Sequence, residues 1–154
     1  SVLCIKWYDY YKIENDTVNV IITSEVQTQI AYKNEETREI YTKNQLKNAR
    51  VEKGFLIIEA HKEKKEQSNY TSARLVTKGK GDWSHGRIEV RAKLPRGRGT
   101  WPAIWMLAST HPLKWPDDGE IDIMEHVGFN PGFIHFSIHT KKFNHIIGTQ
   151  KTDT

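Results

Sequence analysis

Cysteine is nearly absent from this sequence, since Cys4 is the only one among 154 residues. One cysteine excludes an internal disulfide and a cysteine-rich metal site. Long apolar runs are absent too. No stretch is long enough to cross a membrane, and Ser1–Ile5 is too short for the apolar segment of a signal peptide. We therefore expect a soluble chain, either mature or without its export signal.

A large excess of one charge is also missing. The chain carries 23 Lys and Arg against 19 Asp and Glu, a net charge of +4 at pH 7. The basic residues are spread from Lys43 to Arg98, and a block such as Lys62–Lys65 is typical of a solvated loop or strand edge rather than of a phosphate-binding patch. We therefore expect neither a nucleic acid nor a membrane as a partner.

Helical periodicity is the third absence, because no segment shows an amphipathic helix of more than two turns. The sequence instead has short apolar or alternating segments between turn residues. They are Thr17–Ile22, Phe55–Ala60, Arg87–Lys93, Trp101–Ala108, Glu120–Glu125 and Phe133–Thr140. In the third of these, Ile88, Val90 and Ala92 are predicted to share one face of a strand. This pattern predicts a single all-β domain over residues 1–154, an antiparallel sandwich or barrel.

The candidate chemistry lies in the segment Glu120–Glu125. Alternate residues of a strand share a face, so Glu120 and Asp122 point one way and the two isoleucines of the segment point into the core. Strict alternation would place Glu125 on the core face, where an unpaired charge is costly. A β-bulge near Met124 removes this conflict, because one extra residue returns Glu125 to the acidic face.

The predicted spacing of the acids favours one kind of reaction. The Cα atoms of Glu120 and Glu125 would lie roughly 13 Å apart along the bulged strand. Since each side chain can lean inward by roughly 4 Å, the carboxyl groups would be about 5 Å apart, the separation of a retaining glycosidase. Asp122 lies between them and can hydrogen-bond to either. The alternative interpretation is a solvated acidic strand with no catalytic role.

Three tryptophans, Trp101, Trp105 and Trp115, lie within twenty residues of Glu120. Their flat indole faces suit the apolar faces of sugar rings. Tryptophan in a β-sandwich also packs in the core, so one or two of the three are expected to serve packing alone. Together, the acids and the tryptophans indicate a sugar-cleaving cleft.

Several longer motifs extend this pattern over roughly residues 39 to 151. They are the segments 48–52, 70–74, 86–92, 99–107, 115–116, 119–128, 139–140 and 144–145. These motifs resemble the laminarinases, the endo-1,3-β-glucanases of glycoside hydrolase family 16. The acid segment, with Met124 as its extra residue, resembles the laminarinase form, whereas the lichenase form has one residue fewer and no bulge.

The resemblance implies a β-jelly-roll sandwich whose concave sheet forms an open cleft for a β-glucan chain. Domains of this family continue beyond the strand that carries His139, so a jelly roll truncated on its C-terminal side is expected. Its exposed strand edges and core surface would be an aggregation hazard, which a complementing chain or self-association would cover. The resemblance also implies a secreted or extracytoplasmic location.

For the reaction, the resemblance implies retaining hydrolysis of β-1,3-glucan by double displacement. Glu120 would be the nucleophile, Glu125 the general acid/base, and Asp122 the residue that supports the nucleophile. Trp101 and Trp105 would line subsites on the non-reducing side of the cut. Asn48, Arg74 and Trp115 match family positions that contact sugar. His139 is expected near the nucleophile, because it alternates with His135 and Ser137 on one strand face, and ordinary strand packing is the alternative for these histidines.

No cofactor is required for this chemistry, and no metal site is predicted. His135 and His139 would be about 13 Å apart along a strand, too far for a zinc pair. Relatives often carry a structural calcium. The N-terminal signature that serves it is replaced here by Tyr8–Tyr11, and the C-terminal segment that serves it is not in the sequence, so the sequence does not favour calcium but leaves it as an open alternative. Three alternatives stay open: a glucan-binding fragment without catalysis, hydrolysis of mixed-linkage glucan or another polysaccharide, and transglycosylation.

Overall fold

The computed structural model describes residues 2–4, 10–14, 17–21, 32–34, 39–42, 45–66, 68–77 and 81–154. The chain divides into two compact units, one of Ser1–Ile5 with Gly81–Thr154 and one of Lys6–Lys80. A single continuous domain stays a prediction. In the described ranges every regular element is a strand apart from one short 3-10 helix, η1 (His145–Ile147), which agrees with the predicted all-β class.

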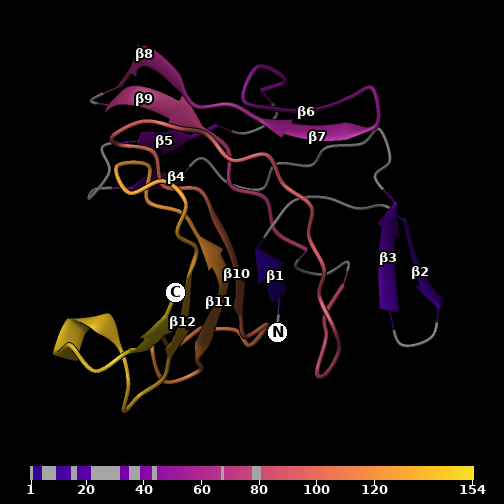
Figure 1. Ribbon diagram of the computed structural model, residues 1–154, viewed down its shortest axis with the longest axis vertical. Helices are drawn as coiled ribbons and strands as arrows, with labels where there is room; N and C mark the ends of the chain where they lie inside the picture. The colour runs from indigo at the N-terminus through magenta and orange to yellow at the C-terminus, as the bar shows by residue number, and fades with distance from the viewer. Residues whose placement is uncertain are drawn as a thin grey trace. The chain divides into compact units, whose positions relative to one another are not determined.

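The first unit is built on a five-stranded antiparallel sheet in the order β1–β10–β11–β12–β13 (Figure 1). Its strands are β1 (Val2–Cys4), β10 (Ala103–Leu107), β11 (Glu120–Glu125), β12 (His135–His139) and β13 (Lys151–Asp153). The last three segments of the predicted series therefore form three neighbouring strands. The sequence pattern does not predict β1 or β13, because three residues are too few to show alternation.

One face of this sheet carries a small apolar core. Ile104, Met106 and Met124 are 5%, 8% and 9% exposed. Partly buried apolar side chains pack against these three, and they are Trp83, Ile88, Leu94, Ile123 and Ile134. Burial of this face fixes the strand register, because a slip by one residue would turn polar side chains into the core.

The predicted strand Arg87–Lys93 is wrong, because the structure has no strand in this segment. Arg87 and Glu89 form an ion pair, as alternate residues on one side of an extended chain can. Ile88 packs on the core, but Val90 is 48% exposed. Alternation predicts which side chains share a face, whereas a strand also needs a neighbouring backbone for its N–H and C=O groups. None of the described strands pairs with this segment.

The second unit contains three small sheets. Two are pairs, β2 (Tyr10–Glu14) with β3 (Thr17–Ile21), and β6 (Ala49–Glu52) with β7 (Phe55–Ile58). The third has the order β4–β5–β9–β8, with β4 (Tyr32–Asn34), β5 (Glu39–Tyr41), β8 (His61–Lys65) and β9 (Ser68–Ser72). Two predicted strands are confirmed here, over Thr17–Ile21 and Phe55–Ile58.

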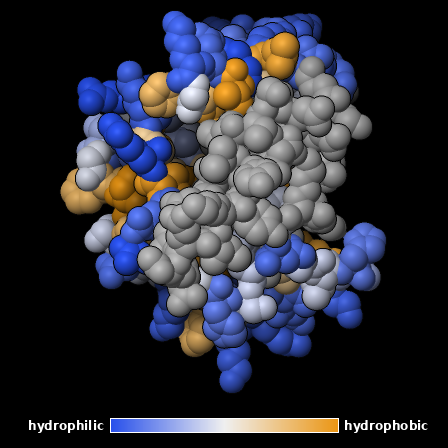
Figure 2. All heavy atoms as spheres, turned by 90° about the vertical axis from the view of Figure 1, so that its right-hand side faces the viewer, coloured by the Kyte–Doolittle hydropathy of each residue, from blue (hydrophilic) through white to orange (hydrophobic). Residues whose placement is uncertain are grey.

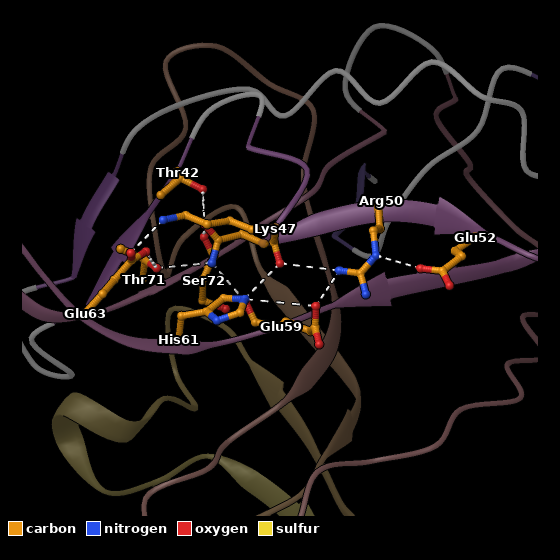
Figure 3. Close-up of polar contacts among 10 residues, drawn as sticks. Thr42, Lys47, Arg50, Glu52, Glu59, His61, Glu63, Thr71 and Ser72 are labelled. Atoms are coloured by element: carbon orange, nitrogen blue, oxygen red, sulfur yellow. Dashed lines mark hydrogen bonds and ion pairs between the residues drawn. The ribbon is translucent and has the colours of Figure 1, made fainter.

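Strands β5 and β9 run parallel, which departs from the predicted antiparallel pairing. Parallel neighbours need a crossover connection, and the residues between them supply it with β6, β7 and β8. Charged pairs lie on β6 and β8 and in the segments beside them (Figure 3). Lys47 Nζ is 2.6 Å from Glu63, and Arg50 bridges Glu52 and Glu59. These pairs are partly exposed, so each contributes little to stability.

The face shown in Figure 2 is mostly hydrophilic over the described residues, with smaller apolar patches between the polar side chains. In the second unit, Ala49, Ala73 and Leu75 form a separate buried cluster. Among the described residues, no helix has the length and apolar character needed to cross a membrane.

Candidate active site

Strand β11 presents its three acids on one face, because a β-bulge interrupts the alternation. Across the β10–β11 pair, Asp122 lies opposite Trp105 and Glu125 lies opposite Ala103. Trp105 and Ala103 are two residues apart on a regular strand, so they share a face. Asp122 and Glu125 therefore share that face although they are three residues apart, and Glu120 joins them by ordinary alternation.

The extra residue of the bulge is Ile123, one position before the predicted Met124. Met124 pairs with Ile104, and the next residue of β10 pairs with Asp122, which leaves Ile123 without a partner. The bulge itself is confirmed, since the β11–β12 register also shifts between Asp122 and Glu125. Because both residues are apolar, the sequence does not show which of them pairs with Ile104.

Asp122 is the most buried of the three acids, with 5% of its surface exposed. Burial raises the pKa of Asp122 to about 8, and the charges of Glu120 and Glu125 and a hydrogen bond with Glu120 act in the same direction. Asp122 is therefore protonated near neutral pH. A protonated carboxyl group donates, so Asp122 can give its proton to a hydrogen bond on Glu120.

His139 lies opposite Glu120 on β12, and it is 7% exposed. Its Nε2 atom is 3.1 Å from Asp122 Oδ2. Because Asp122 is neutral near pH 7, this contact is polar rather than an ion pair. The Nδ1 atom of His139 is buried and has no hydrogen-bond partner among the described residues.

Each of the two glutamates accepts a hydrogen bond from an indole N–H. Trp101 Nε1 donates to Glu125 Oε1 over 3.0 Å, and Trp115 Nε1 donates to Glu120 Oε2. Trp101 is also 61% exposed, so much of its ring can pack against a bound molecule. The two tryptophans therefore hold the carboxyl groups, and Trp101 also offers an exposed ring face.

The loop that carries Trp115 is ordered by Asp118. The Oδ2 atom of Asp118 accepts hydrogen bonds from the Lys114 N–H at 2.8 Å and from Thr110 Oγ1 at 2.9 Å. These hydrogen bonds lower the pKa of Asp118, the backbone bond being the larger cause. Gly119 follows with φ +85°, a conformation that favours glycine, and it turns the chain into β11.

His145 is a site residue that the sequence analysis assigns no role. Its ring centroid is 4.9 Å from that of Trp115 and 5.2 Å from that of His139. The motif at 144–145 is the only sequence signal for it, because a histidine in a loop has no periodicity to mark its direction. The structure therefore adds a third aromatic ring, which contacts both Trp115 and His139.

The other predicted sugar-contacting residues divide between the units. Trp105 is half-buried on β10, on the face of the acids. Asn48 and Arg74 belong to the second unit. Asn48 is fully buried, where it accepts from Thr42 Oγ1 at 2.7 Å and donates to Thr71 Oγ1 at 3.2 Å. Contacts of Asn48 and half-buried Arg74 with sugar stay predictions.

Three described residues could hold a metal ion, namely Glu120, Asp122 and His139. One ligand atom of each lies within 4.8 Å of the other two. Asp122 already contacts both Glu120 and His139, so this grouping is explained without an ion. The sequence argument about a structural calcium rests on Tyr8–Tyr11. Residues 8 and 9 of this segment lie outside the described residues.

The arrangement combines the parts needed for nucleophilic and acid–base chemistry at one centre. Glu120 is a carboxylate with two polar neighbours, Trp115 and Asp122, and Glu125 is a second carboxyl group on the same face. Exposed indole surface lies beside them at Trp101. The separation of the two glutamate carboxyl groups stays a prediction.

The chain matches the family described as the XgeA-like catalytic domain of GH16 over residues 23–154. It is 60% identical over 114 residues to a beta-glucanase of Rhodothermus marinus, an alignment that covers 72% of this chain and 40% of that protein. The chain thus spans less than half the length of that relative.

Solved structures give the same result. The laminarinase of Rhodothermus marinus superposes with a TM-score of 0.73 and 53% identity, covering 84% of this chain and 52% of that one. A variant of SCLam, a non-specific endo-beta-1,3(4)-glucanase from family GH16, superposes with a TM-score of 0.75 and 35% identity. That alignment covers 97% of this chain and 64% of the other, whose active site presents a 1,3-beta-D-cellobiosyl-glucose. The fold is therefore the all-β jelly roll of these proteins.

Proposed function

The chain belongs to glycoside hydrolase family 16, and we propose that it is a retaining endo-β-1,3-glucanase. The observation that carries this proposal is the placement of Glu120 and Glu125 on one face of β11 across a one-residue bulge. Two carboxyl groups within close reach of each other that flank the scissile glycosidic bond are the machinery of retaining hydrolysis. Each carboxyl group is also hydrogen-bonded to an indole, which limits its orientation.

The first half of the reaction forms a covalent glycosyl-enzyme. Glu120 attacks the anomeric carbon while Glu125 gives its proton to the glycosidic oxygen, so the bond between the two sugars breaks. In the second half, Glu125 takes a proton from water as that water attacks the same carbon, which releases Glu120. Two inversions return the anomeric carbon to its original configuration.

Asp122 supports the nucleophile in this scheme. Its protonated form donates to Glu120 and adds no negative charge beside the attacking carboxylate. His139 contacts Asp122 in turn, because its Nε2 atom lies 3.1 Å from Asp122 Oδ2. We infer that these two residues hold Glu120 in the orientation for attack rather than taking part in bond formation.

The substrate class follows from the aromatic residues and from the relatives. Exposed Trp101 and half-buried Trp105 offer flat surfaces to the apolar faces of glucose rings. The proteins of known structure that the chain resembles are named laminarinase and endo-beta-1,3(4)-glucanase. We therefore propose a β-1,3-linked glucan as substrate, bound along the face of β10 and β11 that carries the acids.

The test is product formation from a soluble β-1,3-glucan by the purified 154-residue chain. Glu120→Gln and Glu125→Gln are compared with Glu89→Gln, whose carboxylate is exposed in the same unit. We expect oligosaccharides from the wild type and from Glu89→Gln, none from Glu120→Gln, and a β-anomer as the first product by proton NMR. An α-anomer as first product, or hydrolysis by Glu120→Gln, would overturn the proposed mechanism.

Mixed-linkage glucan and agarose serve as comparison substrates. Faster hydrolysis of either would assign the site to that polysaccharide instead. Binding of the β-1,3-glucan without any product would favour the alternative of a glucan-binding chain. In that case the aromatic surface would bind the sugar, but the acids would not catalyse its hydrolysis.

A further inference from the structure

His145 and Trp115 pack their rings together beside the carboxylates. Their centroids are 4.9 Å apart at an interplanar angle of 34°, a tilted packing of one ring against the other. The ring of His139 meets the edge of His145 at 5.2 Å and lies 6.0 Å from Trp115. Trp115 is therefore contacted by two imidazoles, one from β12 and one from η1.

The backbone that carries His145 is fixed by Asn144, which is 3% exposed. Its Nδ2 atom donates to the Thr140 carbonyl at 3.1 Å, and its Oδ1 atom accepts from the Ile147 N–H. The Thr149 N–H donates to the Asn144 carbonyl at 3.0 Å. A buried amide with its donor and acceptor engaged keeps one conformation. His145 is therefore held in place although it is itself exposed.

We propose that His145 is a positioning residue for Glu120 and that it acts through Trp115. This inference rests on the proposed function, because it takes Glu120 as the attacking group. The imidazole packed on the indole limits the side-chain rotation of Trp115 and so fixes where its N–H points. That N–H donates to Glu120 Oε2, which leaves the carboxylate with one preferred orientation. Small misplacements of a reacting group cost large factors in rate.

The kinetic test is a double-mutant cycle between His145→Ala and Trp115→Phe. His145→Ala should lower kcat by roughly 10- to 100-fold with little change in KM, because the loss is in orientation of the nucleophile. His145→Phe keeps a flat ring and should restore most of the rate. In the Trp115→Phe background, which lacks the indole N–H, His145→Ala should cost almost nothing more. An equal cost in both backgrounds would overturn the proposal.

A second measurement does not depend on turnover. The indole N–H resonance of Trp115 is assigned by its loss from the proton–nitrogen NMR spectrum of Trp115→Phe. In His145→Ala this resonance should move and its exchange with water should accelerate, whereas His145→Phe should leave it close to the wild-type position. An unchanged Trp115 resonance in His145→Ala would overturn the positioning role, whatever the activity.

Ile146→Ala is the matched control, because Ile146 is in the same turn and 70% exposed. It should leave both the rate and the Trp115 resonance unchanged; a loss equal to that of His145→Ala would assign the effect to the turn as a whole and overturn the proposal. If the wild type makes no product from any glucan, the proposed function fails, while the NMR comparison still decides the contact between His145 and Trp115.

Discussion

Trp101 Nε1 donates a hydrogen bond to Glu125 Oε1 over 3.0 Å, although the Trp101 residue is 61% exposed. One side chain therefore has two roles, since it holds a carboxyl group with its N–H and keeps an open ring face for a sugar.

The two roles of Trp101 can be separated by substitution. Trp101→Phe removes the N–H donor and keeps a flat ring, so kcat should fall by roughly 10- to 100-fold while KM changes little. This range follows from a net value of about 1.5–3 kcal/mol for a hydrogen bond to a charged group, which Glu125 is in the second half of the proposed reaction, when it takes a proton from water. Trp101→Ala should also raise KM, because the ring face is gone. Initial rates over a range of β-1,3-glucan concentrations give both constants, and equal KM values for the two variants would contradict this division.

The same pair of residues shows what the sequence predicts well. The alternation of β11 and the cost of a buried charge predict the face of Glu125 and the presence of a bulge. They do not predict that Trp101 and Trp115 donate to the two glutamates, because both tryptophans lie in loops. The side chains of a loop do not alternate regularly between two faces, so the sequence does not show where they point. Their orientation depends on contacts within the loop, such as the hydrogen bonds that Asp118 accepts.

The failed strand prediction at Arg87–Lys93 has a related cause. The alternation is present and Ile88 does reach the core, but the partner strand is a property of the fold and not of the segment. His145 was equally out of reach, because its contact with Trp115 depends on how Asn144 closes a turn. The local sequence pattern thus predicts which side chains share a face of a strand. Strand pairing and the packing of loop side chains depend on the tertiary structure.

Asp122 should make the stability of the protein fall as pH rises. Its pKa is raised to about 8 in the folded state, whereas an unfolded chain releases the proton near 3.8. Between these values the folded state binds more protons, so this carboxyl group costs stability progressively as pH rises from about 4 to about 8. Asp122→Asn removes that cost and should raise the Tm at pH 8 more than at pH 5, by on the order of 2–4 °C for each kcal/mol recovered.

Asp118→Asn is the control, because the contribution of Asp118 to stability should depend on pH in the opposite direction. The pKa of Asp118 is lowered by its hydrogen bonds, so its contribution is present above about pH 4 and is lost as pH falls. Asp118→Asn should therefore lower the Tm more at pH 7 than at pH 3. Thermal unfolding from pH 3 to pH 9 compares the two variants, and parallel Tm profiles for wild type and Asp122→Asn would contradict the buried, protonated state of Asp122.

The sheet face opposite the acids should promote self-association. Ile121, Phe136 and Ile138 are 45%, 49% and 49% exposed, and they share a face of β11 and β12. Adjacent exposed apolar side chains favour contact between copies of a chain. Sedimentation velocity should show association that increases with concentration. Ile138→Lys should weaken it, whereas Phe129→Lys, at a loop residue 65% exposed, should not. A monomer at all concentrations would contradict this prediction.

Deletion of Ile123 should leave the acids on one face, because Ile123 is the residue without a partner in the β10–β11 ladder. Without it, Asp122, Met124 and Glu125 would pair in order with Trp105, Ile104 and Ala103, the partners that they already have. Side chains then alternate regularly along the whole strand, and Glu125 faces the substrate without a bulge. Loss of a partly buried isoleucine should cost about 1–3 kcal/mol of stability, but the protein should fold and retain part of its activity.

Deletion of Ile121 is the matched comparison, since it removes the same side chain from the same strand. It breaks the alternation between Glu120 and Asp122, so one of the two must turn to the core face, and hydrolysis of β-1,3-glucan should be lost. Thermal unfolding separates loss of fold from loss of geometry in both variants. If the two deletions were equally active, or if deletion of Ile123 alone abolished hydrolysis in a folded protein, the bulge would not be what places Glu125, and the register argument behind the active site would be wrong.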